Sequence, residues 1–557
     1  MDNYSWFNHY PTGVPREINP DNYASILELF EECSTKYGDM VAYENMGTAL
    51  TFNQLDTLSE HFAAYLQKVV GLQKGDRVAI QMPNLLQYPI AMFGALRAGM
   101  TVVNTNPLYT SREMEHQFKD SGAKVLIILA NFANNLEKIL DKTDISTVII
   151  TEIGDMLKGL KGPLVNFVVK KVKKMVPPYH LPDALRFKSV LKAGKKATYD
   201  RPSLHGEDIA FLQYTGGTTG VAKGAMLTHR NIIANMEQIS GWMIPKLREK
   251  EETVITALPL YHIFALTVNC LAMLKIGAKN ILITNPRDMK AFIKDLKKYP
   301  FTVLTGVNTL FNGLLNQEEF KNVNFASLKI AVGGGMAVQD AVALEWKKVT
   351  GTALAEGYGL TETSPVLSCN PIDDSERLGT IGLPLPSTEI KLIDDDDQVV
   401  EVGEVGEICA RGPQIMKGYW ERPDETQKVF LVDWIRTGDM GVIDEDGFIK
   451  IVDRKKEMIC VSGFNVYPNE VENVVSSHPK VLEVGAIGVP DERSTEVVKV
   501  YVVKKDESLE EEELIEFCKE NMTGYKVPKY VEFRKELPKS NVGKILRRVL
   551  KEEEEAQ

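Results

Sequence analysis

The sequence predicts an α/β protein with a large N-terminal domain and a small α+β C-terminal domain. The chain has 557 residues, and because single hydrophobic cores stop growing at about 250–300 residues, more than one domain is expected. Over most of the chain, apolar strands alternate with amphipathic helices, which is typical of mostly parallel sheets covered by helices. After residue 373, short alternating strands predict a β-rich subdomain, and the final part of the chain predicts a compact α+β unit.

The predicted elements follow one another in a regular order. A strand is predicted at 76–82, and Pro83 is expected to open a helix that ends near Met100. Thr110 and Glu113 have the spacing of a capping box, which predicts the start of another helix. The other strands of the N-terminal part are predicted at 101–104, 124–129, 148–150, 209–213, 253–258, 303–305 and 328–332. The later strands are predicted at 389–393, 407–410, 448–452, 484–489, 497–504 and 530–534.

Composition argues against several classes of protein. The net charge of −11 argues against general nucleic-acid binding, so no nucleic-acid partner is expected. The six cysteines include no Cys-x-x-Cys pair, which predicts neither a zinc site nor a disulfide framework and fits a reducing cytoplasm. The first ten residues lack the basic start and apolar core of a signal peptide. No apolar run approaches the ~18 residues of a membrane span.

One basic segment departs from the acidic average. Between Lys158 and Lys174 there are six lysines and no acidic residue, and apolar residues are interleaved with them. At about 100° per residue, the apolar positions share one side of a helix and most of the later lysines lie opposite. Such a helix is typical of a membrane-surface contact, and the alternative is a surface helix whose valines pack on the protein. The sequence therefore predicts a cytoplasmic protein with a peripheral contact to the anionic inner face of the cell membrane.

The most informative stretch is 214–224, which reads Tyr-Thr-Gly-Gly-Thr-Thr-Gly-Val-Ala-Lys-Gly. Glycines let the backbone approach an anion closely, threonine hydroxyls add donors, and Lys223 adds a positive charge. A predicted strand precedes the stretch and a predicted helix, 228–240, follows it, which is the layout of a phosphate site. The stretch is not a Walker A sequence, and a flexible surface turn is the alternative. The candidate phosphate-binding residues are Thr215, Gly216, Gly217, Thr218, Thr219, Gly220 and Lys223.

Further motifs accompany this loop in a fixed order. They are Glu-Gly-Tyr-Gly-Leu-Thr-Glu at 356–362, Arg-Thr-Gly-Asp at 436–439, Asp-Arg at 453–454 and Pro-Lys-Ser-Asn-Val-Gly-Lys at 538–544. As an ordered set, they resemble the motifs of the adenylate-forming enzymes, a group that contains acyl-CoA synthetases, luciferases and peptide-synthetase adenylation domains. Within that group, the chain is similar over nearly its whole length to bacterial long-chain-fatty-acid–CoA ligases.

The resemblance implies a reaction in two steps. A carboxylate is a poor electrophile, and joining it to AMP with release of pyrophosphate makes it reactive toward a thiol. Charge develops on the phosphates during the first step, so fixed donors and cations matter more than a covalent nucleophile. The resemblance therefore implies ATP and Mg²⁺ as cofactors, coenzyme A as co-substrate and a long-chain fatty acid as substrate.

The resemblance also assigns roles to individual residues. Lys544 would contact the α-phosphate and the carboxylate, although alone it could be a solvent-exposed lysine. His262 would lie beside the substrate carboxylate, although alone it could be a core histidine. Glu362 and Thr215 would hold Mg²⁺, which prefers oxygen ligands. The other implied nucleotide-binding residues are Gly334, Gly335, Gly357, Tyr358 on the adenine, Gly359, Thr361, Asp439 on the ribose hydroxyls and Arg454.

Because the two steps share one site, the resemblance implies that the C-terminal domain rotates. The predicted N-terminal domain covers residues 1–452 and contains the ATP and fatty-acid sites. The hinge is predicted at 453–456 and the C-terminal domain at 457–557. Rotation about the hinge would remove Lys544 from the site after the adenylate forms.

The rotation would bring another face of the C-terminal domain to the site. That face contains Ser462 and Gly463, where a glycine would let the pantetheine arm of coenzyme A pass close to the backbone. Cys460 stands where some members of the group have a basic residue, so Lys456 is expected to supply one phosphate or coenzyme A contact.

The sequence leaves alternatives open. One is an adenylating ligase that acts on another carboxylic acid or transfers its acyl group to a carrier protein. Another is a non-catalytic lipid-binding or membrane-surface protein. The sequence also does not determine which residues line the acyl tunnel. The candidates could equally be core residues, and they are Phe264, Val307, Leu310 and Phe311. The sequence does not determine the oligomeric state, and a homodimer is one of the states it leaves open.

Overall fold

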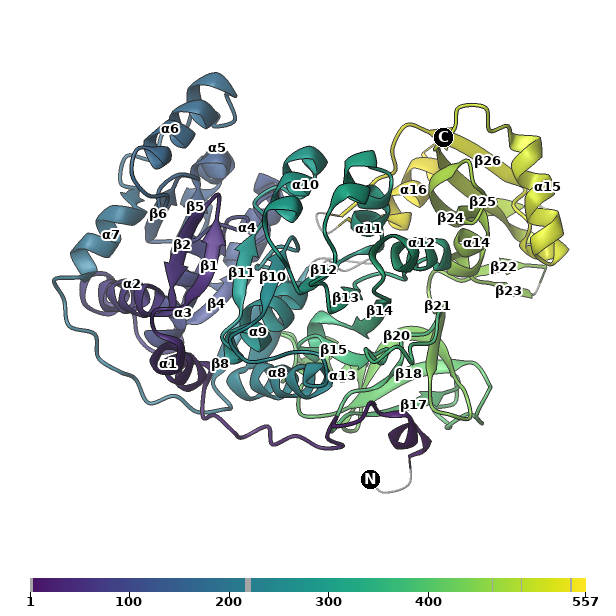
Figure 1. Ribbon diagram of the computed structural model, residues 1–557, viewed down its shortest axis with the longest axis horizontal. Helices are drawn as coiled ribbons and strands as arrows, with labels where there is room; N and C mark the ends of the chain where they lie inside the picture. The colour runs from purple at the N-terminus through teal and green to yellow at the C-terminus, as the bar shows by residue number, and fades with distance from the viewer. Residues whose placement is uncertain (1–3, 216–221, 463, 492, 541–542, 557) are drawn as a thin grey trace.

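The computed structural model describes residues 4–215, 222–462, 464–491, 493–540 and 543–556. Within these ranges the chain forms four β-sheets flanked by helices (Figure 1). Two large sheets, of seven and nine strands, make up most of the N-terminal domain. A five-stranded sheet forms the β-rich subdomain, and another lies in the C-terminal domain. The predicted fold class is therefore confirmed, with mostly parallel large sheets and smaller β-rich and α+β parts.

The seven-stranded sheet contains the strand that precedes the phosphate loop. Its strand order is β7-β6-β5-β3-β4-β8-β9, and every neighbouring pair is parallel except β8 and β9. All five residues of β5 are buried, as expected for a parallel strand covered on both faces. The strands are β3 (Arg77–Gln81), β4 (Thr101–Asn104), β5 (Val125–Leu129), β6 (Thr147–Thr151), β7 (Leu185–Arg186), β8 (Ile209–Thr215) and β9 (Lys223–Thr228).

The nine-stranded sheet contains the strands that lead to the other nucleotide motifs. Its order is β16-β15-β14-β13-β12-β10-β11-β1-β2, and the strands from β14 to β1 are parallel. The strands are β1 (Val41–Asn45), β2 (Thr48–Thr51), β10 (Thr253–Thr256), β11 (Lys279–Leu282), β12 (Val303–Gly306), β13 (Ile330–Gly333), β14 (Leu354–Gly359), β15 (Val366–Cys369) and β16 (Leu383–Pro384).

Helices cover both large sheets. The capping box predicted at Thr110 and Glu113 is confirmed, and the helix that follows it is α4. The longer helices are α1 (Ile26–Tyr37), α2 (Phe52–Tyr65), α3 (Gln87–Arg97), α4 (Ser111–Ser121), α7 (Phe187–Gly194), α8 (His229–Met243), α10 (Met289–Lys298), α11 (Asn308–Leu315) and α12 (Asp340–Thr350). The shorter helices include α5 (Ala133–Glu137), α6 (Lys161–Phe167), α9 (Met273–Lys275), α13 (Pro423–Val429) and the π-helices η5 (Val168–Val172) and η6 (Ala265–Ala272).

The helix predicted from Pro83 begins four residues later, at Gln87. The cause is Asn84, whose side-chain Nδ2 donates hydrogen bonds of 2.9 Å to the carbonyl oxygens of Thr256 and Leu258. Its Oδ1 accepts a 2.8 Å bond from the backbone N–H of Leu260. These hydrogen bonds hold Asn84 against the end of β10, so the helix begins only after it. β10 itself ends at Thr256, two residues earlier than predicted. The hydrogen bonds of Asn84 fix the start of the loop that leads to His262.

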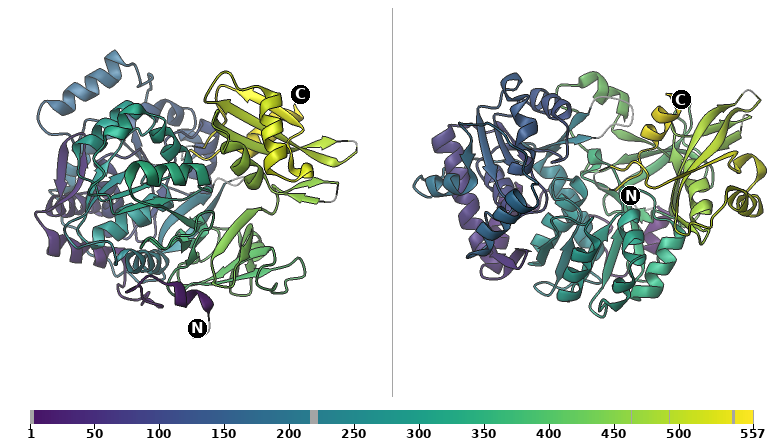
Figure 2. Two further views of the ribbon diagram at one scale, coloured as in Figure 1. Left: turned by 45° about the vertical axis from the view of Figure 1, so that its right-hand side comes forward. Right: turned by 90° about the horizontal axis from the view of Figure 1, so that it is seen from above.

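The β-rich subdomain and the C-terminal domain follow the nine-stranded sheet along the chain (Figure 2). The β-rich subdomain contains β17 (Glu389–Ile393), β18 (Gly406–Arg411), β19 (Phe430–Leu431), β20 (Trp434–Ile443) and β21 (Ile449–Arg454). The C-terminal domain contains β22 (Ile459–Val461), β23 (Phe464–Val466), β24 (Val481–Asp491), β25 (Thr495–Lys504), β26 (Tyr530–Arg534), α14 (Pro468–Ser476), α15 (Glu511–Asn521) and α16 (Arg547–Glu555). The proposed hinge, 453–456, covers the end of β21 and the following turn.

Candidate active site

Two adjoining cavities bring most of the predicted site residues together. The first, of about 660 Å³, lies where β8, β13 and β14 end, as is usual for ligand sites in parallel sheets. The second, of about 1710 Å³, lies between the N-terminal and C-terminal domains. The first is lined by the predicted residues Thr215, Lys223, His262, Gly334, Gly335, Gly357, Tyr358, Gly359, Thr361, Glu362, Arg454 and Lys456. The second adds Asp439 and Lys544.

Of the remaining predicted residues, only Ser462 is described by the structure, and it lines neither cavity. Ser462 is exposed at the end of β22, and its backbone N–H donates a 2.7 Å hydrogen bond to Ser494. The structure therefore places Lys544 at the cavity and Ser462 on another face of the C-terminal domain. Gly216, Gly217, Thr218, Thr219, Gly220 and Gly463 lie outside the described residues.

Two glycines of the nucleotide motifs are required by their surroundings. Gly335 has a backbone φ of +76°, a left-handed conformation that residues with a Cβ rarely adopt. At Gly359, a Cβ would lie 1.7 Å from the carbonyl oxygen of Pro365. The backbone of both turns can therefore approach a flat ligand more closely than a chain with side chains there could.

Tyr358, Asp439 and Arg454 form one polar group at the junction of the cavities. The strand pairing of β20 and β21 sets Asp439 opposite Arg454, and their Oδ1 and Nε atoms are 3.3 Å apart. The Tyr358 hydroxyl donates a 2.6 Å hydrogen bond to Asp439 Oδ2. Asp439 is only 5% exposed, and this burial raises the pKa of its carboxyl group. The group gives the site a carboxylate with a fixed orientation.

Lys544 lies at the cavity and is not a freely solvated lysine. Its loop is closed by a 2.7 Å hydrogen bond from the Ser540 N–H to the Lys544 carbonyl oxygen. The Thr309 hydroxyl, from the N-terminal domain, donates a 3.0 Å bond to the carbonyl oxygen of Gly543. Burial, helped by the neighbouring charge of Arg454, lowers the pKa of Lys544 to about 8. The ammonium group is therefore held where little solvent stabilises its charge.

His262 borders both cavities and is half-buried. Burial lowers its pKa to about 4, so the ring is neutral near pH 7. The backbone N–H of Phe264 donates a 3.3 Å hydrogen bond to His262 Nδ1, which assigns the ring proton to Nε2. A neutral ring with a protonated Nε2 can donate a hydrogen bond to a carboxylate.

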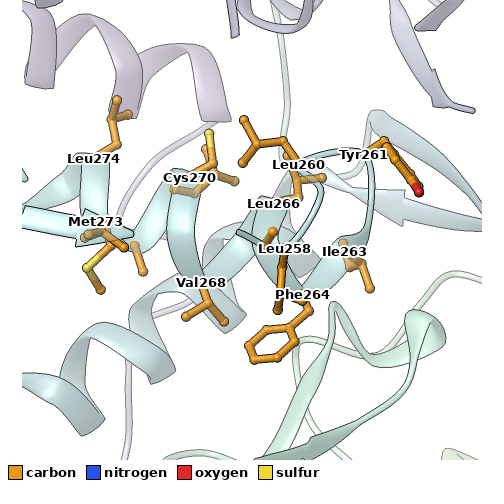
Figure 3. Packing of buried hydrophobic residues seen from close by; sticks show 14 of the residues in the cluster. Leu258, Leu260, Tyr261, Ile263, Phe264, Leu266, Val268, Cys270, Met273 and Leu274 are labelled. Atoms are coloured by element: carbon orange, nitrogen blue, oxygen red, sulfur yellow. The ribbon is translucent and has the colours of Figure 1, made fainter. Parts of the chain in front are cut away.

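The loop that contains His262 is anchored by apolar packing (Figure 3). Leu258, Leu260 and Leu266 are buried on either side of it. Phe264 and Val268 point to the same side, away from the sulfur of Cys270, and both line the smaller cavity. This packing continues into η6, so the histidine lies on a rigid support.

Glu362 and Thr215 line the smaller cavity, as does Lys223 at the start of β9. The described residues contain no cluster of three or more acidic, histidine or cysteine side chains that could hold a metal ion. Mg²⁺ is commonly bound through one or two carboxylates, with substrate phosphates completing its shell. One carboxylate and one threonine hydroxyl therefore fit Mg²⁺ that arrives with a polyphosphate.

Part of the lining of the smaller cavity is apolar, which the sequence analysis did not identify, and this part is called the apolar arm. Its wall is formed by Ile239, Trp242 and Met243 of α8, Val268 of η6, Val332, Val366, Cys369, Ile372 and Leu385. Of the tunnel residues considered from the sequence, Phe264 lines this cavity and Val307 lines only the larger one. Phe311 packs in the core with its ring 4.8 Å from that of Trp346. Apolar periodicity could not find the arm, because core-facing and cavity-facing residues have the same pattern.

Comparison with protein families and curated proteins gives matches along nearly the whole chain. The family model described as AMP-binding enzyme matches residues 30–420. The model described as AMP-binding enzyme C-terminal domain matches residues 470–544. The long-chain-fatty-acid–CoA ligase of Escherichia coli O157:H7 is 60% identical over 98% of both chains. The protein of the same name from Haemophilus influenzae is 55% identical over 99% of this chain and 98% of its own.

Solved structures give the same architecture. ATP-bound MatB from Rhodopseudomonas palustris matches with a TM-score of 0.80 and 27% identity, over 95% of this chain and 98% of its own. The anthranilate CoA ligase AuaEII in complex with anthranoyl-AMP matches with a TM-score of 0.86 over 97% of this chain and 99% of its own. The identity to AuaEII is 24%, so that likeness concerns the fold alone.

Proposed function

Because the chain belongs to the family of AMP-binding enzymes, we propose that it converts long-chain fatty acids to acyl-CoA through an acyl-adenylate, releasing AMP and pyrophosphate. The observation that carries this proposal is the set of residues that line the smaller cavity. Its polar part contains the nucleotide motifs, its other part is an apolar arm, and His262 borders it together with the larger cavity. Relatives that are 55–60% identical bear the name long-chain-fatty-acid–CoA ligase.

In the first step, an oxygen of the fatty-acid carboxylate attacks the α-phosphorus of ATP. A carboxyl–phosphate bond forms and the bond to pyrophosphate breaks, with the electron pair leaving on the pyrophosphate oxygen. Lys544 would neutralise charge on the α-phosphate and carboxylate, and the Nε2–H of His262 would orient the carboxylate. Mg²⁺, held by Glu362 and Thr215 with the phosphates, would supply further neutralisation of charge.

The nucleotide is positioned by the other polar residues. The carboxylate of Asp439 would accept hydrogen bonds from the ribose hydroxyls. Arg454 would offer a cation to ribose or phosphate, and Lys456 would offer one to phosphate or coenzyme A. Tyr358 would stack on adenine, supported by its hydrogen bond to Asp439. In the second step, the coenzyme A thiolate attacks the acyl carbon, the thioester bond forms and AMP leaves with its oxygen.

The decisive experiment measures AMP release with coenzyme A over a series of fatty acids from short to long. The proposal expects activity that depends on both ATP and coenzyme A and is greatest for long chains. Turnover only with aromatic or short acids, or only with a carrier protein, would support the alternative of another adenylating ligase. ATP–pyrophosphate exchange that no acid stimulates would support a non-catalytic lipid-binding protein.

We also propose that the C-terminal domain, 457–557, rotates about residues 453–456 between the two steps. Proline restricts φ, and the N–H of Lys456 donates no hydrogen bond to a described residue, so Lys456→Pro removes no such contact. Lys456→Ala is the matched control for loss of the side chain. The proline variant is expected to slow thioester formation relative to the alanine variant. Equal rates of both steps in the two variants would contradict this hinge.

The structure supports a contact between α6–η5 and an anionic membrane. Leu160, Leu164 and Phe167 share one face and are 88%, 61% and 58% exposed. The helix protrudes from the edge of the molecule (Figures 1 and 2), and the lysines around it have no acidic neighbour in the segment. Among the described residues, no helix combines the length and apolar character of a membrane span. A peripheral contact by apolar insertion and charge attraction therefore suits this segment.

Sedimentation with vesicles tests this contact. We expect binding to phosphatidylglycerol vesicles that weakens with salt, and little binding to phosphatidylcholine. The double variant Leu164→Ser with Phe167→Ser should lose binding, whereas Leu344→Ser should not. Leu344 is a suitable control because it is a similarly exposed leucine, at 60%, on α12. Unchanged binding by the double variant would rule out this segment as the contact.

A further inference from the structure

A segment from a third part of the chain joins the strand after the phosphate loop to the acidic end of the 356–362 motif. This bridging segment covers residues 416–420. It pairs with β9 through hydrogen bonds from Met226 to Gly418 (2.9 Å), from Lys417 to Met226 (3.0 Å) and from Trp420 to Gly224 (2.8 Å). Its first N–H, on Met416, donates a 2.8 Å bond to the backbone carbonyl oxygen of Glu362. The segment therefore fixes β9 and Glu362 relative to each other.

Tyr419 is the fourth of the five residues of the bridging segment and lines the smaller cavity. Its hydroxyl donates a 2.7 Å hydrogen bond to Glu362 Oε1. The Nζ atom of Lys223 lies 4.5 Å from the centroid of its ring, a cation–π distance, and 2.9 Å from Glu425 Oε2. Tyr419 is only 6% exposed, so its ring and hydroxyl are held by the surrounding packing.

Within the part of the chain that the structure describes, Glu362 is restrained by a hydrogen bond to one oxygen of its carboxylate. Among the described residues, the Tyr419 hydroxyl is the hydrogen-bond donor to Oε1, and Oε2 accepts no hydrogen bond. A carboxylate with one oxygen held and the other free has a fixed direction for a cation. Without the Tyr419 hydroxyl, the same carboxylate would have to be ordered when the metal and the phosphates bind, and that ordering reduces affinity.

We propose that Tyr419 is a positioning residue that holds the Glu362 carboxylate for Mg²⁺ and keeps it at a fixed spacing from Lys223. The inference rests on the proposed function, which assigns Glu362 to the metal, and on Lys223 as a candidate phosphate-binding residue. Tyr419 makes two separate contacts. The hydroxyl acts on Glu362, and the ring acts on Lys223.

The variant Tyr419→Phe separates these contacts because it keeps the ring and removes only the hydroxyl. Calorimetric titration of Mg²⁺ into enzyme with ATP, without fatty acid, measures metal binding once the same titration into ATP alone has been subtracted. Loss of a hydrogen bond to a charged acceptor is expected to raise the Mg²⁺ concentration at half-saturation about tenfold. Tyr37→Phe is the matched control, since its hydroxyl donates a 2.8 Å bond to Lys275 outside both cavities. The control should leave the half-saturation point unchanged.

A double-mutant cycle distinguishes positioning from a general structural effect. Glu362→Gln should itself weaken Mg²⁺ binding, and adding Tyr419→Phe to it should cause no further shift. An equal shift from Tyr419→Phe in both backgrounds would overturn the inference. So would normal Mg²⁺ binding by Tyr419→Phe while Glu362→Gln is impaired, and the proposed function would stand. If Glu362→Gln bound Mg²⁺ normally, the metal assignment in the proposed function would itself be wrong.

Discussion

The polar part and the apolar arm of the smaller cavity are built in different ways. The polar part depends on single side chains, such as those of His262, Asp439 and Glu362, each held by one hydrogen bond, at Nδ1, Oδ2 and Oε1 respectively. The apolar arm depends on the summed shape of side chains from α8, η6 and the strands around β14. The comparison teaches that losing one polar atom should affect the reaction more than reshaping one wall of the arm.

The largest effect is expected for Lys544→Ala. Removing a fixed positive charge from the reacting phosphate should slow adenylation about 10²–10³-fold. Thioester formation from a supplied acyl-adenylate should change only a few-fold, because the second step needs no charge from this lysine. Single-turnover assays of each half-reaction measure the two effects separately. Equal losses in both steps would contradict the assigned role.

The next largest effect is expected in the pH dependence of adenylation. The pKa of Lys544 is lowered to about 8, so the side chain is charged below that pH and loses its proton above it. The kcat/KM of adenylation should therefore fall up to about tenfold per pH unit above pH 8. The thioester step from supplied acyl-adenylate is the control and should lack this limb. A break near the ordinary lysine pKa instead would mean that burial does not act on Lys544 in the free enzyme.

The smallest effect is expected in the apolar arm. Ile239→Trp adds volume to the α8 wall, which should exclude part of a long chain while leaving the nucleotide contacts unchanged. The ratio of kcat/KM for long acids to that for short acids should fall about tenfold, with the KM for ATP unchanged. AMP release across the fatty-acid series measures this ratio. A uniform loss for all acids would place Ile239 outside the acyl path and make the arm a core feature.

The sequence predicted much of the fold because its signals are local. The capping box at Thr110 depends on residues three apart, and the strand predicted at 124–129 contains the continuous apolar run 125–129, so both were correctly placed to within one residue. The predicted start of α3 was wrong because Asn84 is held by the carbonyl groups of Thr256 and Leu258, which are distant in the chain. No local pattern contains that information.

The candidate site likewise contains residues that local motifs identified and residues that only the structure identified. Glu362, Asp439 and Lys544 were nominated from short motifs, and the structure brings them to the two adjoining cavities. Tyr419 was missed because its hydrogen bond to Glu362 joins two separate stretches of the chain. Phe311 was considered for the tunnel, yet it packs against Trp346.

The sequence by itself determined the types of chemical group, their order along the chain and the alternation that produces parallel sheets. Only the tertiary structure decided which apolar side chains face the cavity, which hydroxyl orients Glu362 and how far the pKa of Lys544 falls. The reason is physical. Motifs and periodicity arise from neighbours along the chain, whereas burial and electrostatic environment arise from residues that meet only after folding.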